Sequence, residues 1–173
     1  MTTPIPDVLL TTYLEMTQRA DFIPAFLNEG SGLEVLHMPT PDLAYSKFLY
    51  EAVGSLWRWR DRLVMPEAEL AALLTRSTVD VLYAGGVPAG YIELEAQGED
   101  TEIAYFGLRP AFFGRGLGKH LLSRGIDRAW NEGARRVWVH TCNLDGPHAL
   151  ANYQKRGFRI YKTTEAPMPE QYV

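Results

Sequence analysis

The residues with the clearest chemical potential are three glycines and two basic residues in the stretch Gly114-Arg115-Gly116-Leu117-Gly118-Lys119. Glycine lets a backbone approach a ligand closely, because it has no side chain and tolerates positive φ. A helical pattern begins at Leu117, and the unpaired N–H groups of a first helical turn favour an anion. Arg115 and Lys119 add positive charge. The stretch therefore predicts a cradle for a phosphate or pyrophosphate.

Two common phosphate-binding patterns do not fit this stretch. A P-loop ending at Gly118-Lys119 requires glycine at 113 and Ser or Thr at 120, and the chain has Phe113 and His120. The GxGxxG pattern of dinucleotide-binding folds meets Lys119 or Leu121 where its last glycine belongs. A tight strand–helix connection that binds nothing is the other interpretation of the glycines.

The neighbouring segments place the glycines between a strand and a helix. Glu102–Leu108 is predicted to be a strand, which Arg109-Pro110 ends because proline has no N–H to give to a ladder. Apolar residues then recur at intervals of three and four from Leu117 to Trp130, which predicts a helix with one buried face. Gly133 ends that helix.

Two motifs resemble those of the GCN5-related N-acetyltransferases, the GNAT superfamily. The window Phe113–Gly118 is similar to the family's coenzyme A loop, [Gln/Arg]-x-x-Gly-x-[Gly/Ala], and follows Leu108-Arg109-Pro110, which resembles the family's Val-x-Pro. Further on, Ala149–Phe158 resembles the family's Ala-x-x-x-Tyr-x-x-x-Gly-Phe. The order and spacing of the motifs also match, and the resemblance is clearest over 78–164. The chain departs from the family at Phe113, where Gln or Arg is usual, and at Gly146, where Asn is common.

The resemblance implies that acetyl-coenzyme A is the co-substrate. It places the pantetheine along the family's fourth strand and the pyrophosphate on the N–H groups of the glycine-rich loop. The implied residues are Phe106, Gly107 and Leu108 on the strand, and Phe113, Gly114, Arg115, Gly116, Leu117, Gly118 and Lys119 in the loop. Asn143 is a further candidate for hydrogen bonds to the pantetheine amides.

Tyr153 is one predicted catalytic residue. It stands where the family has the tyrosine that gives a proton to the coenzyme A thiolate. A phenol with a pKa of about 10 is well matched to an alkyl thiolate. Packing of a helix against the sheet is the alternative role for this side chain.

Glu93 is predicted to be the catalytic base. An alkylamine is mostly an ammonium ion at pH 7, so acyl transfer to it requires a base. Glu93 is central in its strand and alternates with Tyr91 and Glu95, a polar row that suits the wall of a cleft. A solvated face is the other interpretation of these carboxylates and of Glu102, which alternation places on the face of Phe106, opposite Tyr105. His140 is predicted to be a core histidine, and a role as base or in contact with the substrate is the alternative.

The remaining patterns predict a single α/β (α+β) domain over 1–173, with a mixed, mostly antiparallel twisted sheet and helices on both faces. Strands are predicted at 8–16, 33–38, 79–84, 89–96, 102–108, 136–142 and 158–163, and helices at 42–53, 66–74, 117–132 and 147–156. Asp21 is predicted to cap a short helix through Leu27, Asp145 to cap the last helix, and the segment from Thr164 to be irregular. The strand 136–142 is predicted to be covered on both faces. The Trp- and Arg-rich stretch 55–62 has two interpretations, amphipathic packing or a wall of the acceptor site.

The totals narrow the class of protein. The chain has 173 residues, 46% of them hydrophobic, with a formal charge of −4. This charge argues against nucleic-acid binding by broad electrostatics and favours a cationic or amine substrate. Cys142 is the only cysteine and the four histidines lack metal-ligand spacing, so neither a disulfide nor a metal is expected. No apolar run approaches about 18 residues and no signal-peptide pattern is present, so a cytoplasmic protein without membrane contact is expected.

The leading hypothesis is therefore an acyl-CoA-dependent N-acyltransferase. It would transfer acetyl directly to a primary amine of a small molecule or a peptide. The alternatives are O-acylation, a longer acyl donor, and a non-catalytic acyl-CoA sensor or interaction domain that retains the loop but has no base. A homodimer is compatible with each of them.

Overall fold

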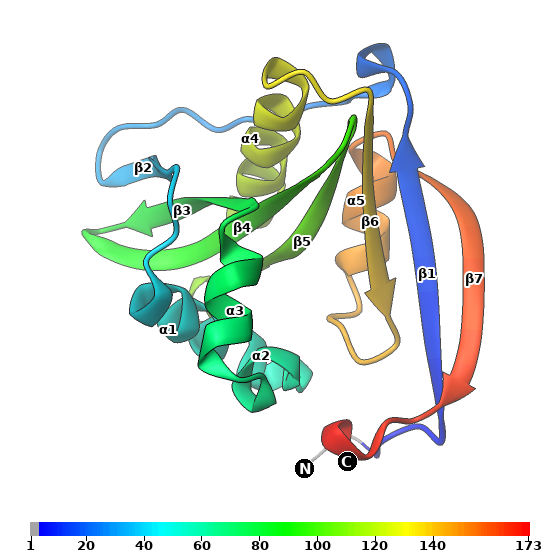
Figure 1. Cartoon of the computed structure of the whole chain (residues 1–173). Coiled ribbons are helices and arrows are strands. Elements are labelled where there is room, and N and C mark those ends of the chain that lie inside the picture. The colour runs from blue at the N-terminus through cyan, green and yellow to red at the C-terminus, as the bar shows by residue number, and fades with distance from the viewer. Residues whose placement is uncertain (1–3) are drawn as a thin grey trace.

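A seven-stranded sheet with helices on both faces forms the body of the protein (Figure 1). The structure is a computed structural model and describes residues 4–173. The strands are β1 (Val8–Met16), β2 (Leu33–Met38), β3 (Ser77–Ala84), β4 (Val87–Gln97), β5 (Asp100–Leu108), β6 (Arg136–Cys142) and β7 (Arg159–Pro167). Their order in the sheet is β2-β3-β4-β5-β6-β1-β7. Neighbours are antiparallel except β5 and β6, so the predicted mixed, mostly antiparallel sheet is confirmed.

Helices pack on both faces of the sheet because successive side chains of a strand point to opposite faces, and both faces of β4 are apolar and buried. On β4, Tyr91 packs in a buried cluster with α1, whereas Ile92 packs in the larger cluster with α4. One face carries α1 (Leu43–Gly54), α2 (Asp61–Val64) and α3 (Glu67–Leu74); the other carries α4 (Leu117–Asn131) and α5 (Ala149–Lys155). Short 3₁₀ turns are η1 (Arg19–Asp21), η2 (Ser55–Trp57), η3 (Pro110–Phe112) and η4 (Glu170–Tyr172).

The parallel contact between β5 and β6 is short. Only Asp100–Glu102 pairs with Arg136–Trp138, after which the two strands diverge (Figure 1). β6 instead stays paired along its whole length with β1 on its other side. The second half of β5 therefore lacks a strand neighbour on the side facing β6.

A bulge in β5 changes which residues share a face. Glu93 pairs with Tyr105 and Leu94 with Ile103, so Ala104 is an extra residue in β5. Glu102 pairs with Glu95, and directly opposed residues lie on the same face of a sheet. Glu102 therefore shares a face with Tyr105, and the predicted placement opposite Tyr105 is wrong because simple alternation does not allow for the bulge.

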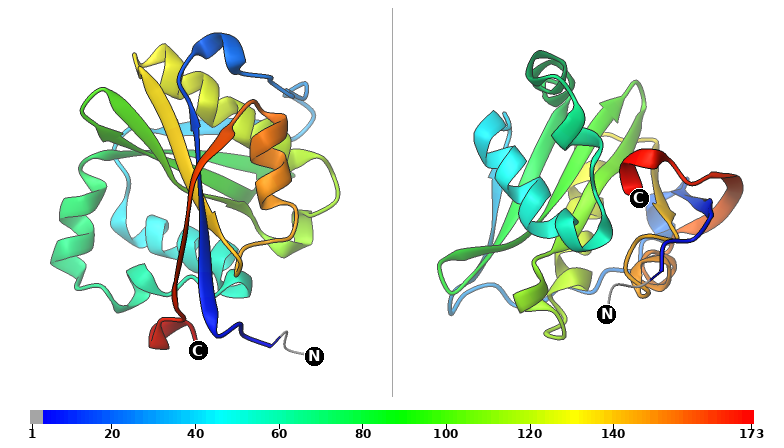
Figure 2. Two further views of the ribbon diagram at one scale, coloured as in Figure 1. Left: turned by 90° about the vertical axis from the view of Figure 1, so that its right-hand side faces the viewer. Right: turned by 90° about the horizontal axis from the view of Figure 1, so that it is seen from below.

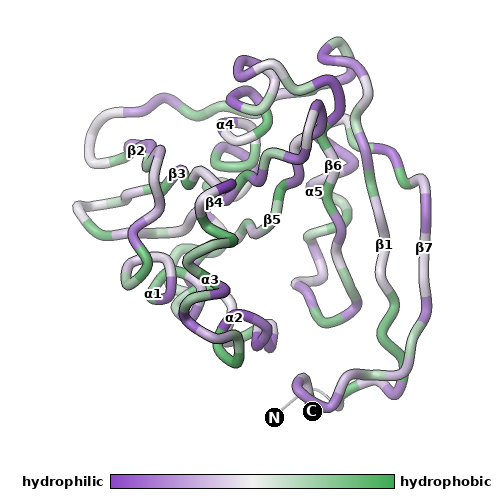
Figure 3. The backbone as a smooth tube through the Cα atoms, in the orientation of Figure 1, coloured by the Kyte–Doolittle hydropathy of each residue, from purple (hydrophilic) through white to green (hydrophobic). Residues whose placement is uncertain are grey.

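The α1–α3 layer covers only half of the sheet. Val137, Val139 and Thr141 of β6 are buried toward α4 and α5, but the alternating residues on the other face are not. The prediction that β6 is covered on both faces is therefore wrong. All but one of the residues of the edge strand β7 are exposed, and the strand is largely hydrophilic in Figure 3. Charged side chains on an edge strand discourage unwanted pairing.

Two other segments differ from the predictions. Asp21 ends η1, and no helix runs on to Leu27. The chain is extended there, and side chains of α4 satisfy its backbone: Ala25 N–H donates to Ser123 Oγ at 2.9 Å and Leu27 N–H to His120 Nδ1 at 3.0 Å. The segment after Thr164 is not irregular, because β7 pairs with β1 as far as Pro167 and η4 follows.

Glycine 125 sets the distance between α4 and the sheet. A Cβ atom at Gly125 would overlap the fully buried side chain of Ile92 on β4. Helix propensity alone favours alanine over glycine by about 1 kcal/mol. We expect Gly125→Ala to destabilise the protein all the same, by about 1–3 kcal/mol, because overpacking a dense core costs more than the propensity gains.

Urea denaturation of Gly125→Ala, Ile92→Ala and the double variant measures this effect. The two substitutions should be coupled, with the double variant more stable than the sum of the single changes indicates, because the smaller side chain makes room for the new methyl group. Additive losses would contradict the packing argument.

Candidate active site

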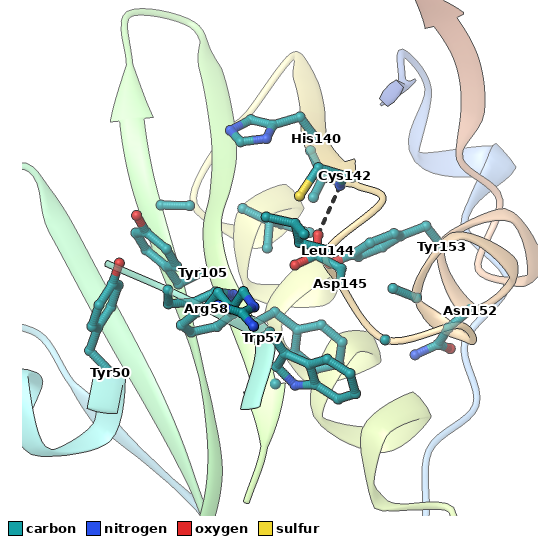
Figure 4. Close-up of a pocket in the computed structure, with 18 of the residues that line it drawn as sticks. Tyr50, Trp57, Arg58, Tyr105, His140, Cys142, Leu144, Asp145, Asn152 and Tyr153 are labelled. Atoms are coloured by element: carbon teal, nitrogen blue, oxygen red, sulfur yellow. Dashed lines mark hydrogen bonds between the residues drawn. The ribbon is translucent and has the colours of Figure 1, made fainter. Parts of the chain in front are cut away.

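A cleft of about 650 Å³ lies where β5 and β6 diverge. Its walls come from β5 and β6, from the η2–α2 segment, from the start of α4 and from α5 (Figure 4). This volume is in the range of small-molecule sites.

The glycine-rich loop forms one end of this cleft. Gly116 stands at the start of α4 in the left-handed region, with φ 74°, and Gly114 has φ 77°. Within the described residues no side chain caps α4, so the first-turn N–H groups are free to bind an anion. A Cβ at Gly118 would lie 3.7 Å from Leu108 and 4.0 Å from Asn152, in the space between β5 and α5. The cradle therefore fits a pyrophosphate held by backbone N–H groups, with Lys119 beside it.

Most of the predicted cofactor residues line the cleft. They are Phe106, Gly107, Leu108, Phe113, Gly116, Gly118 and Lys119. Three others in the loop do not line it: Gly114 supplies a turn, the Arg115 guanidinium lies over the ring of Phe112, and Leu117 is buried in the core. Asn143 is not part of the wall either. Its side chain accepts from Leu10 N–H at 3.0 Å and donates to the Val8 carbonyl at 2.9 Å, which fastens β6 to β1.

Tyr153 extends from α5 into the cleft (Figure 4). Its side chain is only 6% exposed, and its ring meets Phe106 and Phe158 edge-on, with centroids 6.2 and 6.0 Å apart. Burial, and then the charge of Asp145, raise the pKa of the Tyr153 phenol above its ordinary value. The hydroxyl therefore stays protonated at neutral pH and is available as a hydrogen-bond donor.

Glu93 lies outside the cleft wall. Its carboxylate is completely buried, and Arg62 donates to both of its oxygens, at 2.6 and 2.5 Å. The Arg62 guanidinium also lies 4.4 Å above the ring of Tyr105. The structure does not bring Glu93 together with Tyr153 in the cleft, and its two oxygens are already committed to Arg62.

Glu102 and His140 are neighbouring titratable side chains that do line the cleft. His140 Nε2 lies 3.7 Å from Glu102 Oε1, and the Gln97 amide donates to the other Glu102 oxygen at 2.6 Å. Burial, followed by the negative charges of Glu95 and Glu93, raises the pKa of Glu102 to about 7. A carboxylate with this pKa is suited to take a proton near neutral pH.

His140 is not the predicted core histidine. Its side chain is 48% exposed, because it lies on the face of β6 that no helix covers. Water reaches it inside the cleft, yet the surrounding walls still withdraw it from bulk solvent, and this burial lowers the pKa of the imidazole. His140 is therefore neutral at pH 7 and able to accept a proton or a hydrogen bond.

The stretch 55–62 forms the cleft wall opposite β6. Five of its residues line the cleft: Trp57, Arg58, Trp59, Asp61 and Arg62. The position of this stretch therefore supports its interpretation as a wall of the site. Arg62 also packs on the ring of Tyr105, as the interpretation of amphipathic packing predicts.

Several residues of the cleft are not predicted from the sequence, among them Asn152, Asp145 and Tyr172. Asn152 lies within the second motif, in which Tyr153 is the only predicted site residue. Asp145 does not cap α5; its carboxylate accepts from Thr141 Oγ1 at 2.6 Å and from Cys142 N–H at 2.9 Å, closing the turn after β6. Tyr172 belongs to no sequence motif, and only the fold brings it to the cleft.

In residues 4–173, no group of three or more His, Cys, Asp or Glu side chains is arranged to hold a metal ion. None of the helices in that range is long and apolar enough to cross a bilayer.

Comparisons with known proteins give one consistent family. A family model described as "Acetyltransferase (GNAT) family" matches residues 44–158. A mycothiol acetyltransferase of Corynebacterium efficiens is 32% identical over 101 residues, which cover 58% of this chain and 34% of that protein. The uncharacterized N-acetyltransferase YvbK of Bacillus subtilis is 33% identical over 88 residues, covering 50% of this chain and 56% of that protein. The chain thus spans between about a third and just over half of the length of these curated relatives.

Among solved structures, an IAA acetyltransferase from Bacillus cereus is similar in fold. Its TM-score is 0.59 at 27% sequence identity, over 75% of this chain and 79% of that chain.

The glycine-rich loop gives a direct binding test. In Gly116→Val, the branched side chain would be strained at positive φ and its Cβ would lie 3.3 Å from Lys119 Cε, so the N–H groups could no longer approach a pyrophosphate. We expect calorimetric affinity for acetyl-CoA to fall at least about tenfold, equivalent to about 1.4 kcal/mol.

Gly98→Val is the matched control, because Gly98 also has positive φ, 65°, but lies in the β4–β5 turn away from the cleft. It should lose comparable stability and keep its affinity. Equal affinities in the two folded variants would contradict the role of the loop.

Proposed function

The chain belongs to the acetyltransferase (GNAT) family, and we propose that it transfers an acyl group, acetyl above all, from acyl-CoA directly to a primary amine of a small molecule or peptide. The observation that carries this proposal is the composition of one cleft. The anion cradle of α4, the Tyr153 hydroxyl and the Glu102–His140 pair all line it. The relatives named as acetyltransferases support the same reaction class.

The chain's own residues divide the work of binding. The N–H groups at the start of α4 and Lys119 would hold the pyrophosphate of coenzyme A. The unpaired edge of β5 around Phe106–Leu108 offers backbone groups to the pantetheine amides. Acetyl-CoA supplies the activated acyl group as a thioester, and the acceptor amine would then approach from the side of Glu102.

We assign the base to Glu102 in place of Glu93. Glu102 takes a proton from the acceptor ammonium, directly or through a water, and the free amine attacks the thioester carbonyl. The new C–N bond forms as the C–S bond breaks, and the electron pair of that bond leaves on sulfur. Neutral His140 is a neighbour of this carboxyl group, with its Nε2 3.7 Å from Glu102 Oε1, which is longer than a hydrogen bond. Glu93 keeps a different task, which is to neutralise buried Arg62.

Tyr153 is assigned to the leaving group. Its protonated hydroxyl donates a hydrogen bond to the thiolate and passes on the proton that the amide nitrogen loses. The amine thus loses two protons, one to Glu102 and one to the sulfur, and the products are an amide, a thiol and one proton.

The alternative of a non-catalytic acyl-CoA sensor is disfavoured by the carboxylate of Glu102 beside His140 in the cleft, because acyl-CoA binding alone gives no reason for a base there. A thiol-release assay with acetyl-CoA across amines, polyamines, amino acids and peptides tests the proposal, and longer acyl-CoAs and alcohols in the same assay test the other donors and acceptors. Acyl-CoA binding without thiol release on any acceptor would falsify the enzymatic assignment.

The role of Glu102 predicts a particular pH profile. In the wild type, kcat/KM should rise as the pH passes about 7, because the ionised form of Glu102 is the base and its pKa is raised to about 7. Glu102→Gln should lower the rate at pH 7 by about a hundredfold to ten-thousandfold and remove this limb, leaving activity that rises only as the free amine becomes abundant.

Glu95→Gln is the control, since Glu95 is the carboxylate directly across from Glu102. Removing its negative charge lowers the pKa of Glu102, so the limb should move to lower pH and persist. If His140→Ala abolishes the limb and Glu102→Gln leaves it in place, the histidine is the base and this assignment is wrong.

The role of Tyr153 is tested by Tyr153→Phe, which keeps the ring and its packing against Phe106 and Phe158. Turnover should fall roughly tenfold to a thousandfold, with little change in calorimetric affinity for acetyl-CoA, because only the proton donor is removed. Unchanged turnover in a folded variant would show that the ring is structural.

A further inference from the structure

The segment that follows β7 crosses the cleft and is fastened on its far side. Tyr172 Oη donates to the Asp61 carboxylate, 2.7 and 2.9 Å from its two oxygens, and Gln171 Nε2 donates to Asp61 Oδ1 at 2.6 Å. Arg58 Nη1 donates in turn to the carbonyl of Tyr172 at 3.1 Å. We call these four residues, Arg58, Asp61, Gln171 and Tyr172, the clasp.

The clasp joins two walls that are otherwise connected far away. η4 continues from β7, which belongs to the β6-β1-β7 half of the sheet, whereas Arg58 and Asp61 belong to the η2–α2 segment over the other half. Between these halves the sheet itself provides only the three-residue pairing of β5 with β6. Seen from below, η4 lies between the two halves (Figure 2, right).

The clasp lies at the end of the cleft that is opposite the glycine-rich loop. η4 is on the face of the sheet that carries α1–α3, and the loop is on the face of α4 (Figures 1 and 2). Asp61 and Tyr172 themselves line the cleft. An acceptor that reaches Glu102 from the face opposite the cofactor cradle therefore meets the clasp.

The η2–α2 segment makes a second bridge across the cleft. The ring of Trp57 lies 6.2 Å from that of Phe113, and a Cβ at Gly146, in the loop after β6, would lie 3.2 Å from the Trp57 ring. The next residue, Arg58, has a left-handed backbone, with φ 59° and ψ 34°, which is uncommon for a residue other than glycine. The η2 segment is thus held in a defined conformation across the cleft.

We propose that the clasp limits the acceptor to a small amine that fits in the cleft beside it, with Asp61 and Tyr172 as specificity-determining residues. This inference rests on the proposed acyl transfer. A peptide bound as an extended strand needs a continuous open groove, and four hydrogen bonds of the clasp cross the place where the groove would run. The remaining space is shared with the pantetheine arm, which leaves only part of about 650 Å³ for the acceptor.

The chemistry of the cleft walls indicates the kind of small amine. The walls carry aromatic rings from both halves of the sheet, the carboxylate of Asp61 in the clasp, and those of Glu95 and Glu102, which oppose each other across β4 and β5. The rings that line the cleft are those of Tyr13, Tyr50, Trp59, Tyr105 and Tyr172. Such a chamber suits an ammonium group attached to an aromatic or other apolar body, because the rings cover the body and the carboxylates attract the charge.

The test compares acceptors in the wild type and in clasp variants. The acceptors are the best small amine found in a panel that includes 2-phenylethylamine, and a lysine-containing hexapeptide. Tyr172→Phe removes the hydroxyl and keeps the ring, and the double variant Gln171→Ala, Tyr172→Ala removes every side-chain bond from η4 to Asp61. Glu170→Gln is the control, because Glu170 is an exposed residue of the same turn outside the clasp.

The wild type and Glu170→Gln should prefer the small amine. In the double variant, the ratio of kcat/KM for peptide over small amine should rise at least tenfold, with Tyr172→Phe in between. Calorimetric affinity for acetyl-CoA should stay unchanged in all of them, which also shows that each variant is folded.

Two results overturn the inference. One is a wild type whose kcat/KM for the peptide equals that for the best small amine. The other is a double variant in which the ratio of these two values is the same as in the wild type. Both leave the proposed acyl transfer standing. If the wild type releases no thiol with any of the acceptors, the proposed function itself is overturned, and the inferred acceptor class with it.

Discussion

The short parallel contact between β5 and β6 is the constraint on which the rest of the site depends. Three residue pairs hold the two halves of the sheet together, and beyond them the facing backbone groups of both strands have no strand partner. Backbone N–H and C=O groups withdrawn from water need partners, so this gap suits the pantetheine arm that we propose for it, which carries amides of its own. Because the strands diverge, β5 runs toward the glycine-rich loop and β6 toward α5. The end of β5, the loop and Tyr153 therefore meet in one cleft.

The buried pair of Arg62 and Glu93 determines what the acceptor side of the cleft can do. Removing one partner from such a pair typically costs about 3–5 kcal/mol, because the other charge is left buried and unpaired. The pair therefore holds α2 firmly on the sheet, with Arg62 packed on Tyr105. It also removes Glu93 from proton transfer. Glu95 and Glu102 remain opposed in the cleft, and burial together with these like charges gives Glu102 the raised pKa that a base requires.

The parts of the site that could be predicted from the sequence are those encoded locally. The glycine-rich loop and Tyr153 lie in continuous motifs, and the strands and long helices follow from hydrophobic periodicity, so these elements lie where they were expected. The base could not be chosen in this way, because Arg62 is 31 residues from Glu93 and the bulge at Ala104 changes the face of Glu102. The prediction that His140 lies in the core was wrong for a related reason. Alternation identifies the residues that share its face of β6, but it does not show that no helix covers that face. Tyr172 reaches the cleft only through tertiary contacts.

Because the helix layer on one face is partial, the segment after β7 can reach across the cleft to η2 and α2. α1–α3 cover the β2–β5 half of their face, and the β6-β1-β7 half is left without a helix, so the cleft between the halves would stay open on that side. η4 and η2 bridge it with hydrogen bonds of half-buried or exposed groups to the charged side chains of Asp61 and Arg58, each worth about 1.5–3 kcal/mol. The inner wall, by contrast, is held by a fully buried charge pair. Local opening follows the weakest contacts of a structure. We therefore expect any local opening of the cleft to begin at the clasp, whose bonds are exposed or part-buried, and to leave the buried pair of Arg62 and Glu93 in place.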